Sequence, residues 1–386
     1  MILMTGADGY LGWPTLLKLS AAFPEERIVG VDSLARRKWV EEVGSVSATP
    51  IESLAERVKS AAACGFSNIS MLEADLTDRD TVYLLLQTYR PRAIVHLAAQ
   101  PSAPYSQING ERANFTQENN NQMCRNLLWG LYELNLKTCH FIETTTTGIY
   151  GAPEMDIPEG DITLLGWNNK PERVPYPAMA TSWYHMSKCQ DAANMRLAHF
   201  QWGLPISELR TAIVFGADTT ETKLDPRLST RFDFDFYFGV LPNRFVAQAL
   251  ADCPITVYGK GYQKKPMIPL EEAATSIVQL VLQGPTEELS IYNQYTHLAS
   301  PVDLANALQN VTKRKNMNVQ ITHMTNPRTE REEHPMKMAH ERFQTCLLPQ
   351  KPMSMEQCID SMLDTLMPYK SVLKAYRDRF ISASSN

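Results

Sequence analysis

The sequence lacks the features that mark membrane proteins and nucleic-acid-binding proteins. Its 386 residues contain no uninterrupted run of roughly 18 apolar residues, the minimum for a membrane-spanning helix. Lysine and arginine number 37 against 42 aspartates and glutamates, a net charge of −5. No basic surplus is therefore available to neutralise the phosphates of a nucleic acid. We expect neither a membrane nor a nucleic acid among its partners.

Cysteines are few and scattered. The seven cysteines are odd in number and form no Cys-x-x-Cys pair, so the sequence predicts no zinc knuckle, no disulfide framework and no metal site. The first apolar segment begins at Ile2, which leaves no room ahead of it for a signal or transit peptide. These features predict free thiols in a reducing cytoplasm.

What is present is the composition of an ordinary globular protein. Hydrophobic residues make up 44% of the chain and charged residues 20%, which excludes a disordered or fibrous protein. Domains usually run to about 100–200 residues, so the length predicts two domains, or one large α/β unit with an appended cap.

Short apolar segments alternate with helical patterns along the first hundred residues. The segments at 2–5, 27–32, 70–75 and 93–97 are predicted strands, and continuous apolar strands separated by helices are typical of a parallel sheet buried on both faces. Residues 33–68 are longer than an ordinary connection and carry a helical pattern near 51–63, which predicts an insertion.

The second half of the chain is less regular. Further strands are predicted at 139–143, 205–210 and 213–215, and residues 217–245 carry many charges and aromatic side chains with little periodicity. We predict an α/β fold with a Rossmann-type doubly wound parallel sheet in residues 1–216. A smaller C-terminal substrate-binding cap would take up mainly residues 217–386, with some segments returning to the sheet.

Three glycines between the first strand and the first helix suit a dinucleotide. Gly6, Gly9 and Gly12 would let the backbone turn tightly against a pyrophosphate, where the helix N-terminus offers free N–H donors. Asp32 follows about 20 residues beyond Gly12, at the end of the second strand, where a carboxylate binds a ribose 2′-hydroxyl and repels a 2′-phosphate. The pattern predicts NAD as cofactor. The alternative is a set of turn glycines and a solvated aspartate.

Three nearby residues complicate this prediction. Arg36 and Arg37 follow Asp32 closely, and arginine can accommodate the 2′-phosphate of NADP, although we still favour NAD. Asp75 follows the third strand and could accept a hydrogen bond from the adenine amino group. Its alternative role is to cap the helix that starts nearby.

A tyrosine and a lysine lie four residues apart, at Tyr184 and Lys188, which places them on one face of a helix. A phenol with a pKa of about 10 is a poor base at neutral pH. A neighbouring ammonium and the positive nicotinamide ring both favour the phenolate. The tyrosinate can then take a proton from a sugar hydroxyl while a hydride leaves for NAD.

Four threonines, Thr144 to Thr147, end the strand predicted near residue 139. A hydroxyl at this position could hold the substrate oxygen in line with the tyrosine. The alternative is a run of strand-forming residues that only pairs in the sheet. Because alternate side chains of a strand point to opposite faces, at least one threonine should face the site.

Together these motifs resemble the extended short-chain dehydrogenase/reductases, in particular the nucleotide-sugar epimerase/dehydratase family. Within that family the chain is most similar to the UDP-sulfoquinovose synthases, and the similarity runs nearly end to end. The stretches that carry it are residues 8–13, 102–106, 184–188, 256–261, 326–328 and 332–334.

The resemblance implies a Rossmann domain that keeps NAD throughout turnover, a cap that binds a UDP-sugar, and a homodimer. It implies a catalytic set of Thr146, Tyr184 and Lys188, with His185 either a helper or an ordinary helix-face residue. The implied cofactor contacts are Gly6, Gly9, Tyr10, Leu11, Gly12, Asp32, Asp75, Leu76, Leu97, Ala98, Asn119, Tyr184 and Lys188. The implied substrate contacts are Gln100, Tyr105, Thr147, Asn243, Arg244, Val257, Tyr258, Gln263, Lys265 and Arg328.

The chain departs from the synthases at four positions. Ala99 and Pro101 stand where the synthases have a glutamate and an arginine, Ile149 replaces a glutamate, and Lys265 replaces an arginine near the nucleotide. Sulfite addition needs an acid/base carboxylate and a cationic pocket for the anion. These losses leave C4 oxidation of the sugar intact and weaken the case for sulfite chemistry.

Three functions follow from the sequence. The first is NAD-dependent modification of a nucleotide sugar, such as a UDP-hexose, through C4 oxidation and re-reduction. The second is UDP-sulfoquinovose synthesis with a remodelled sulfite pocket. The third is a catalytically silent NAD-binding regulator, against which the retained Tyr184 and Lys188 argue.

Overall fold

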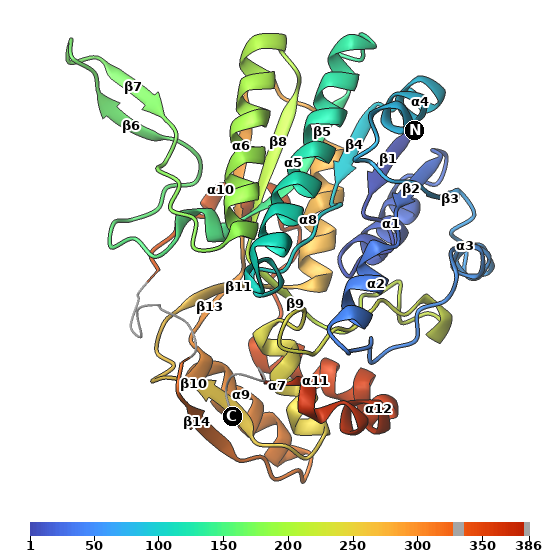
Figure 1. Cartoon of the computed structure of the whole chain (residues 1–386), viewed down its shortest axis with the longest axis vertical. Coiled ribbons are helices and arrows are strands. Elements are labelled where there is room, and N and C mark those ends of the chain that lie inside the picture. Colours follow the sequence, from blue (N-terminus) through green and yellow to red (C-terminus); the bar gives the residue numbers. More distant parts are fainter. Residues whose placement is uncertain (327–335, 382–386) are drawn as a thin grey trace.

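A seven-stranded parallel sheet forms the centre of the protein, as a computed structural model shows for residues 1–326 and 336–381 (Figure 1). Its strand order is β12-β8-β5-β4-β1-β2-β3, and each neighbouring pair is parallel. The strands are β1 (Ile2–Thr5), β2 (Ile28–Asp32), β3 (Ile69–Glu73), β4 (Ala93–His96), β5 (His140–Thr146), β8 (Ile206–Thr211) and β12 (Ser290–Gln294). The predicted Rossmann-type α/β fold is confirmed.

Helices cover both faces of this sheet (Figure 1). One face carries α4 (Arg79–Tyr89), α5 (Gly110–Glu133) and α6 (Trp183–Trp202), and the other carries α1 (Gly12–Ala22) and α8 (Leu270–Gln283). In β1, the side chains of Ile2 and Met4 pack on the α1 and α8 side, whereas Leu3 packs on the α4 and α5 side. All three are fully buried, which explains why the strands are continuously apolar.

The predicted insertion contains two helices, α2 (Ala35–Glu42) and α3 (Leu54–Ala63). The link between them is tied to a segment from the second half of the chain. The Ala48 amide donates to the Phe232 carbonyl oxygen at 2.9 Å, and the Thr49 hydroxyl donates to the Thr230 carbonyl oxygen at 2.6 Å. The insertion therefore joins the sheet domain to residues 225–239.

A smaller region lies beside the C-terminal ends of the strands. It holds a parallel strand pair and a three-stranded sheet, surrounded by helices around a second apolar core. Its strands are β10 (Ile255–Tyr258), β14 (Ile321–Met324), β9 (Ile213–Phe215), β11 (Lys265–Pro269) and β13 (His297–Ala299). Its helices are α7 (Leu241–Leu250), α9 (Pro301–Arg314), α11 (Met355–Leu366) and α12 (Lys370–Ala375).

The chain crosses between the two regions more than once. Although both follow residue 216, β12 is an edge strand of the large sheet and α8 packs on that sheet, and α10 (Glu341–Leu347) packs on α8. The domain division at residue 216 stays a prediction.

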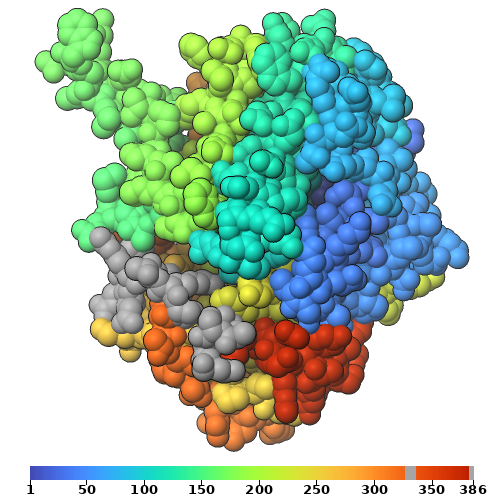
Figure 2. Space-filling model, viewed as in Figure 1, coloured from blue at the N-terminus to red at the C-terminus, as the bar shows by residue number. Residues whose placement is uncertain are grey.

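An antiparallel hairpin that the sequence did not predict stands out from the body of the protein, formed by β6 (Ile162–Leu165) and β7 (Pro171–Val174) (Figures 1 and 2).

Among the residues described, no helix is long and apolar enough to cross a membrane.

Candidate active site

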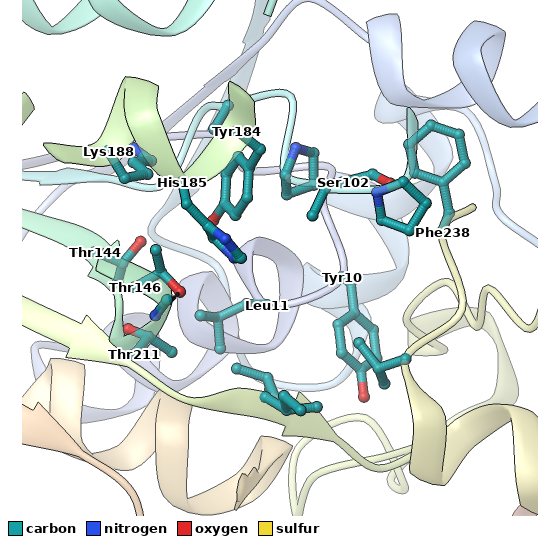
Figure 3. A pocket seen from close by; sticks show the side chains of 18 of the residues that line it. Tyr10, Leu11, Ser102, Thr144, Thr146, Tyr184, His185, Lys188, Thr211 and Phe238 are labelled. Carbon is teal, nitrogen blue, oxygen red and sulfur yellow. Dashed lines mark hydrogen bonds between the residues drawn. The ribbon is translucent and has the colours of Figure 1, made fainter. Parts of the chain in front are cut away.

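A cavity of about 560 Å³ lies between the C-terminal ends of the central strands and the smaller region. The loop after β1, the end of β5 and the start of α6 all contribute to its wall. In Figure 3, Tyr184, His185, Lys188, Thr144 and Thr146 lie toward one end of the cavity, and Tyr10 and Phe238 lie toward the other. The sequence motifs from three separate segments therefore meet in one space.

The glycine loop leaves no room for side chains. Gly6 has a φ of +72°, and a Cβ atom there would lie 2.6 Å from the Ala98 amide nitrogen. A Cβ atom on Gly12 would lie 1.9 Å from the Gly6 carbonyl oxygen. Among the described residues, no side chain caps the N-terminus of α1. The Trp13 amide donates to the Gly9 carbonyl oxygen at 3.1 Å and Pro14 has no N–H, so the amides before Trp13 are the ones that an anion would meet. This cradle fits the pyrophosphate of NAD.

The Asp32 carboxylate is fixed at the edge of the cavity. Its oxygens accept hydrogen bonds from the Asp8 amide at 2.9 Å and the Leu34 amide at 2.7 Å. Burial raises the pKa of Asp32, and these two amides partly offset that effect. The carboxylate lies at the end of β2, where the sequence predicts a ribose contact.

Both arginines that complicated the cofactor prediction are engaged with carboxylates. Arg37 donates to the two carboxylate oxygens of Asp8, each at 2.8 Å. Arg36 donates to Asp233 at 2.7 Å, and its guanidinium lies 4.1 Å from the centre of the Phe238 ring. Each guanidinium is therefore paired with a carboxylate, which agrees with a preference for NAD, although the Arg36 Nη1 atom has no hydrogen-bond partner in the part of the chain that the structure describes.

Most of the predicted cofactor residues line the cavity, and Asp75 does not. Asp75 is exposed, and its carboxylate accepts hydrogen bonds from the Thr77 amide at 2.9 Å and the Thr77 hydroxyl at 2.8 Å. The cap of α4 is Asp78, whose carboxylate accepts a hydrogen bond from the Thr81 amide at 3.1 Å, so the alternative role of Asp75 as that cap is wrong and the adenine contact stays a prediction. The residues that line the cavity are Gly6, Gly9, Tyr10, Leu11, Gly12, Asp32, Leu76, Leu97, Ala98, Asn119, Tyr184 and Lys188.

Tyr184 and Lys188 lie in the first two turns of α6. Ser182 caps this helix by accepting a hydrogen bond from the His185 amide at 3.1 Å, and the Tyr184 amide donates to the Ser106 hydroxyl at 3.1 Å. These bonds fix the start of the helix beside the cavity. Both predicted side chains line the same wall (Figure 3).

The electrostatics of this pair differ from the sequence-based expectation. Burial raises the pKa of Tyr184, and the positive charge of Lys188 lowers it without overcoming that effect. The lysine therefore acts in the predicted direction, but the phenol is not acidified in the protein alone. Lys188 is itself ion-paired with Glu143 at 2.9 Å and Asp191 at 3.2 Å.

The end of β5 places threonine hydroxyls in the cavity wall. Thr144 and Thr146 lie near Tyr184 in Figure 3, and the Thr146 hydroxyl accepts a hydrogen bond from the Gly148 amide at 3.0 Å. Thr145 donates to Glu208 at 2.7 Å. All four threonines belong to the cavity lining, so at least one faces the site, as the sequence predicts.

His185 also lines the cavity, and its position depends on a glycine. A Cβ atom on Gly148 would lie 2.4 Å from the His185 Nε2 atom, so only glycine lets the ring come this close to the chain. The His185 Nδ1 atom is 3.1 Å from the Thr181 hydroxyl.

Five of the predicted substrate residues line the cavity: Thr147, Arg244, Tyr258, Gln263 and Lys265. Arg328 lies outside the described residues.

Four other predicted substrate residues lie behind the cavity wall, and direct contact is withdrawn for each. Gln100 is fully buried and donates to the Thr116 hydroxyl at 2.8 Å. Tyr105 donates to Glu42 at 2.7 Å. Asn243 accepts from the Gly216 amide at 3.1 Å and donates to the Tyr10 hydroxyl at 3.2 Å, and Val257 packs in the second apolar core.

The sequence analysis missed two carboxylates beside the site, Glu143 and Asp191. Signals for both were present. Glu143 is a charge within an otherwise apolar strand, and Asp191 lies three residues beyond Lys188, on the same helix face.

Comparison with known proteins identifies the family. A model of the NAD dependent epimerase/dehydratase family matches residues 2–293. The chain belongs to this family. It is therefore an NAD-dependent enzyme, and the predictions of family and cofactor are confirmed.

Members of this family with named activities are similar to the chain over most of its length. The UDP-sulfoquinovose synthase of spinach chloroplasts is 34% identical over 96% of this chain and 76% of its own. The UDP-sulfoquinovose synthase of Sulfolobus acidocaldarius is 34% identical over 97% and 95%. The structure of UDP-glucuronic acid 4-epimerase from Bacillus cereus in complex with NAD has a TM-score of 0.67 and 19% identity, and the match covers 100% and 99% of the two chains. The last likeness shows the fold alone.

Proposed function

We propose that the protein oxidises C4 of a nucleotide sugar, with a UDP-hexose as substrate, and then re-reduces the modified 4-keto sugar. The observation that carries the proposal is the meeting of Thr146, Tyr184 and Lys188 in the cavity that the glycine loop also lines. The names of the similar proteins support it, because they act on UDP-sugars.

The residues around the cavity would have separate roles in cofactor binding, proton transfer and orientation of the sugar. The glycine loop and Asp32 would hold NAD, which when bound accepts the hydride from the sugar and returns it. The base would be the Tyr184 phenolate, which Lys188 and the positive nicotinamide ring of bound NAD would favour; it takes the proton of the sugar C4 hydroxyl to become the phenol, and it gives the proton back on re-reduction. Thr146 is placed to orient the same sugar oxygen, and His185 is placed to assist proton transfer.

The nucleotide would lie at the wall formed by Arg244, Tyr258, Gln263 and Lys265. The Arg244 guanidinium lies 5.9 Å from the centre of the Tyr258 ring. Arginine matches two phosphate oxygens with its planar fork, and lysine contributes a compact charge. This wall therefore suits a diphosphate and supports a nucleoside diphosphate sugar as the substrate class.

Synthesis of UDP-sulfoquinovose is the second candidate, and the 34% identity to two such synthases favours it. The cavity wall argues the other way, because Ala99 and Pro101 both line it and neither carries a charge. Without a carboxylate and an arginine at these two positions, the cavity wall suits an epimerase-type isomerisation better than sulfite addition.

Incubation of the purified protein with UDP-glucose, with and without sulfite, followed by mass spectrometry and sugar analysis, tests the proposal. An isobaric product with changed stereochemistry supports epimerase-type chemistry. A mass gain that requires sulfite supports the synthase. If NAD is bound but UDP-glucose, UDP-galactose and UDP-glucuronic acid all remain unchanged, the proposal fails in favour of a silent NAD-binding protein.

We further propose that the protein works as a cytoplasmic homodimer. All seven cysteines are free thiols. Large apolar side chains are exposed on the paired helices α5 and α6 and on the hairpin, among them Trp129, Leu197, Phe200 and Trp167, with Phe200 86% exposed. Two such helix pairs can bury each other about a twofold axis. Light scattering should give twice the monomer mass for the protein and the monomer mass for Phe200→Glu; a monomeric wild type would contradict the proposal.

A further inference from the structure

Behind the candidate active site lies a buried group of charged side chains that the proposed reaction does not yet use. The Lys188 ammonium contacts Glu143 from β5 at 2.9 Å and Asp191 from α6 at 3.2 Å. The lysine side chain is 4% exposed and both carboxylates are 0% exposed. Ion pairs this deep are not screened by solvent, so each charge acts strongly on its neighbours.

Both carboxylates are held by further hydrogen bonds. The Cys124 thiol donates to the second oxygen of Glu143 at 3.3 Å, and the Asn121 side-chain amide donates to the second oxygen of Asp191 at 2.7 Å. The lysine is thereby held by one carboxylate from β5 and one from its own helix. Both carboxylates are in turn hydrogen-bonded to side chains of α5. The Lys188 ammonium is thereby fixed between β5 and α6.

The charges in this group do not balance when all three residues are ionised. One ammonium and two carboxylates leave one uncompensated negative charge in the interior, which is costly. Burial raises the pKa of Glu143 to about 8, although Lys188 opposes this rise. The raised pKa of Glu143 reflects this cost.

These negative charges act on Tyr184. They oppose the effect of Lys188, because a nearby negative charge disfavours the phenolate. Other titratable side chains near the group are Cys124 on α5 and His96 on β4, and His185 on α6 lies beside Tyr184. The His96 pKa is lowered by burial and by Lys188, so this ring is neutral, and the His185 ring centre lies 5.4 Å from that of Tyr184.

We propose that Glu143 and Asp191 are positioning residues that hold the Lys188 ammonium beside Tyr184 and set the pH at which the Tyr184 phenol ionises. The inference deepens the proposed function, since it concerns the residue to which that function assigns proton transfer. The two carboxylates that keep the lysine in place also cancel part of the decrease that the lysine causes in the pKa of the Tyr184 phenol.

The ionisation of Tyr184 can be followed without any turnover. The full-length protein would be labelled with ¹³C at the tyrosine Cζ atoms and titrated by NMR. The Tyr184 signal, one among 15 tyrosines, is identified by its absence from Tyr184→Phe. Both carboxylates raise the pKa of Tyr184. We therefore expect Glu143→Gln and Asp191→Asn each to lower its midpoint by about 1 pH unit. Midpoints that are unchanged or higher in both variants would overturn the inference.

Two control variants separate charge from packing. Cys124→Ser keeps both carboxylates and a donor to Glu143, so the Tyr184 midpoint should stay where it is. Lys188→Met removes the positive charge and should raise the midpoint. If one carboxylate variant fails to fold, the other decides the question by the same criterion. The result is also independent of the proposed function, because a lack of product from UDP-sugars would leave the NMR titration unaffected.

Discussion

Replacing Gly12 by alanine tests the cofactor cradle most sharply, because the cost can be worked from the structure. The new methyl carbon would start 1.9 Å from the Gly6 carbonyl oxygen. Non-bonded heavy atoms pack at roughly 3.5 Å, so α1 and the glycine loop must separate by about 1.6 Å. That movement opens the turn that presents the amides at the start of α1.

Overpacking of this kind costs about 1–3 kcal/mol of folding free energy. We therefore expect Gly12→Ala to lower the melting temperature by a few degrees at most, since 1 kcal/mol corresponds to roughly 2–4 °C in a protein of 150–250 residues and to less in this longer chain. The larger effect should be on NAD. A cradle displaced by more than 1 Å should lose at least about 1.4 kcal/mol of binding free energy, which is a tenfold rise in Kd.

Gly110→Ala is the matched control, because Gly110 is also the first residue of a helix, α5, and a Cβ atom there would meet nothing within 4 Å. Isothermal titration calorimetry with NAD and thermal denaturation would be run on both variants. Gly110→Ala should behave like the wild type. If Gly12→Ala also keeps the wild-type Kd and melting temperature, the reasoning about the loop is refuted.

Three other substitutions probe a residue of the cavity wall and two buried carboxylates behind it. Asp32→Ala should weaken the preference for NAD over NADP, and an unchanged ratio of the two Kd values would argue against the ribose contact. Asp8→Asn leaves the buried Arg57, 3.1 Å from Asp8, without its carboxylate and should cost about 3–5 kcal/mol in urea denaturation; a loss below 1 kcal/mol would show that the ion pair is dispensable. The pKa of Glu143 is about 8 in the folded protein, which is above its value in the unfolded chain. The stability that the protein gains from protonation of Glu143 is therefore fully present below about pH 4 and is lost as the pH rises to 8. The melting temperature of the wild type should therefore fall relative to that of Glu143→Gln between pH 5 and 8, and a constant difference would contradict the assignment.

The sequence predicted those parts of the fold that depend on local patterns. Strands buried on both faces are continuously apolar, so β1 and β4 were found within one residue of their ends. The spacing of Tyr184 and Lys188 placed both on one helix face, and the glycine triplet located the cradle. Each of these features is written within a short stretch of chain.

The parts that could not be predicted depend on contacts between distant segments. Nothing near Arg36 indicates that its partner is Asp233, which lies 197 residues further along the chain. Gln100 and Asn243 were assigned to the substrate by resemblance, yet tertiary hydrogen bonds hold both behind the cavity wall. The burial that raises the pKa of Tyr184 is likewise a property of the folded protein.

The central claim is that the Tyr184 hydroxyl moves the proton during a hydride transfer that bound NAD completes. Tyr184→Phe removes only this oxygen, so single-turnover kinetics with UDP-glucose should slow by roughly 10²–10⁴-fold while the NAD content of the purified protein stays the same. A Tyr184→Phe protein that converts the sugar at the wild-type rate would contradict the account.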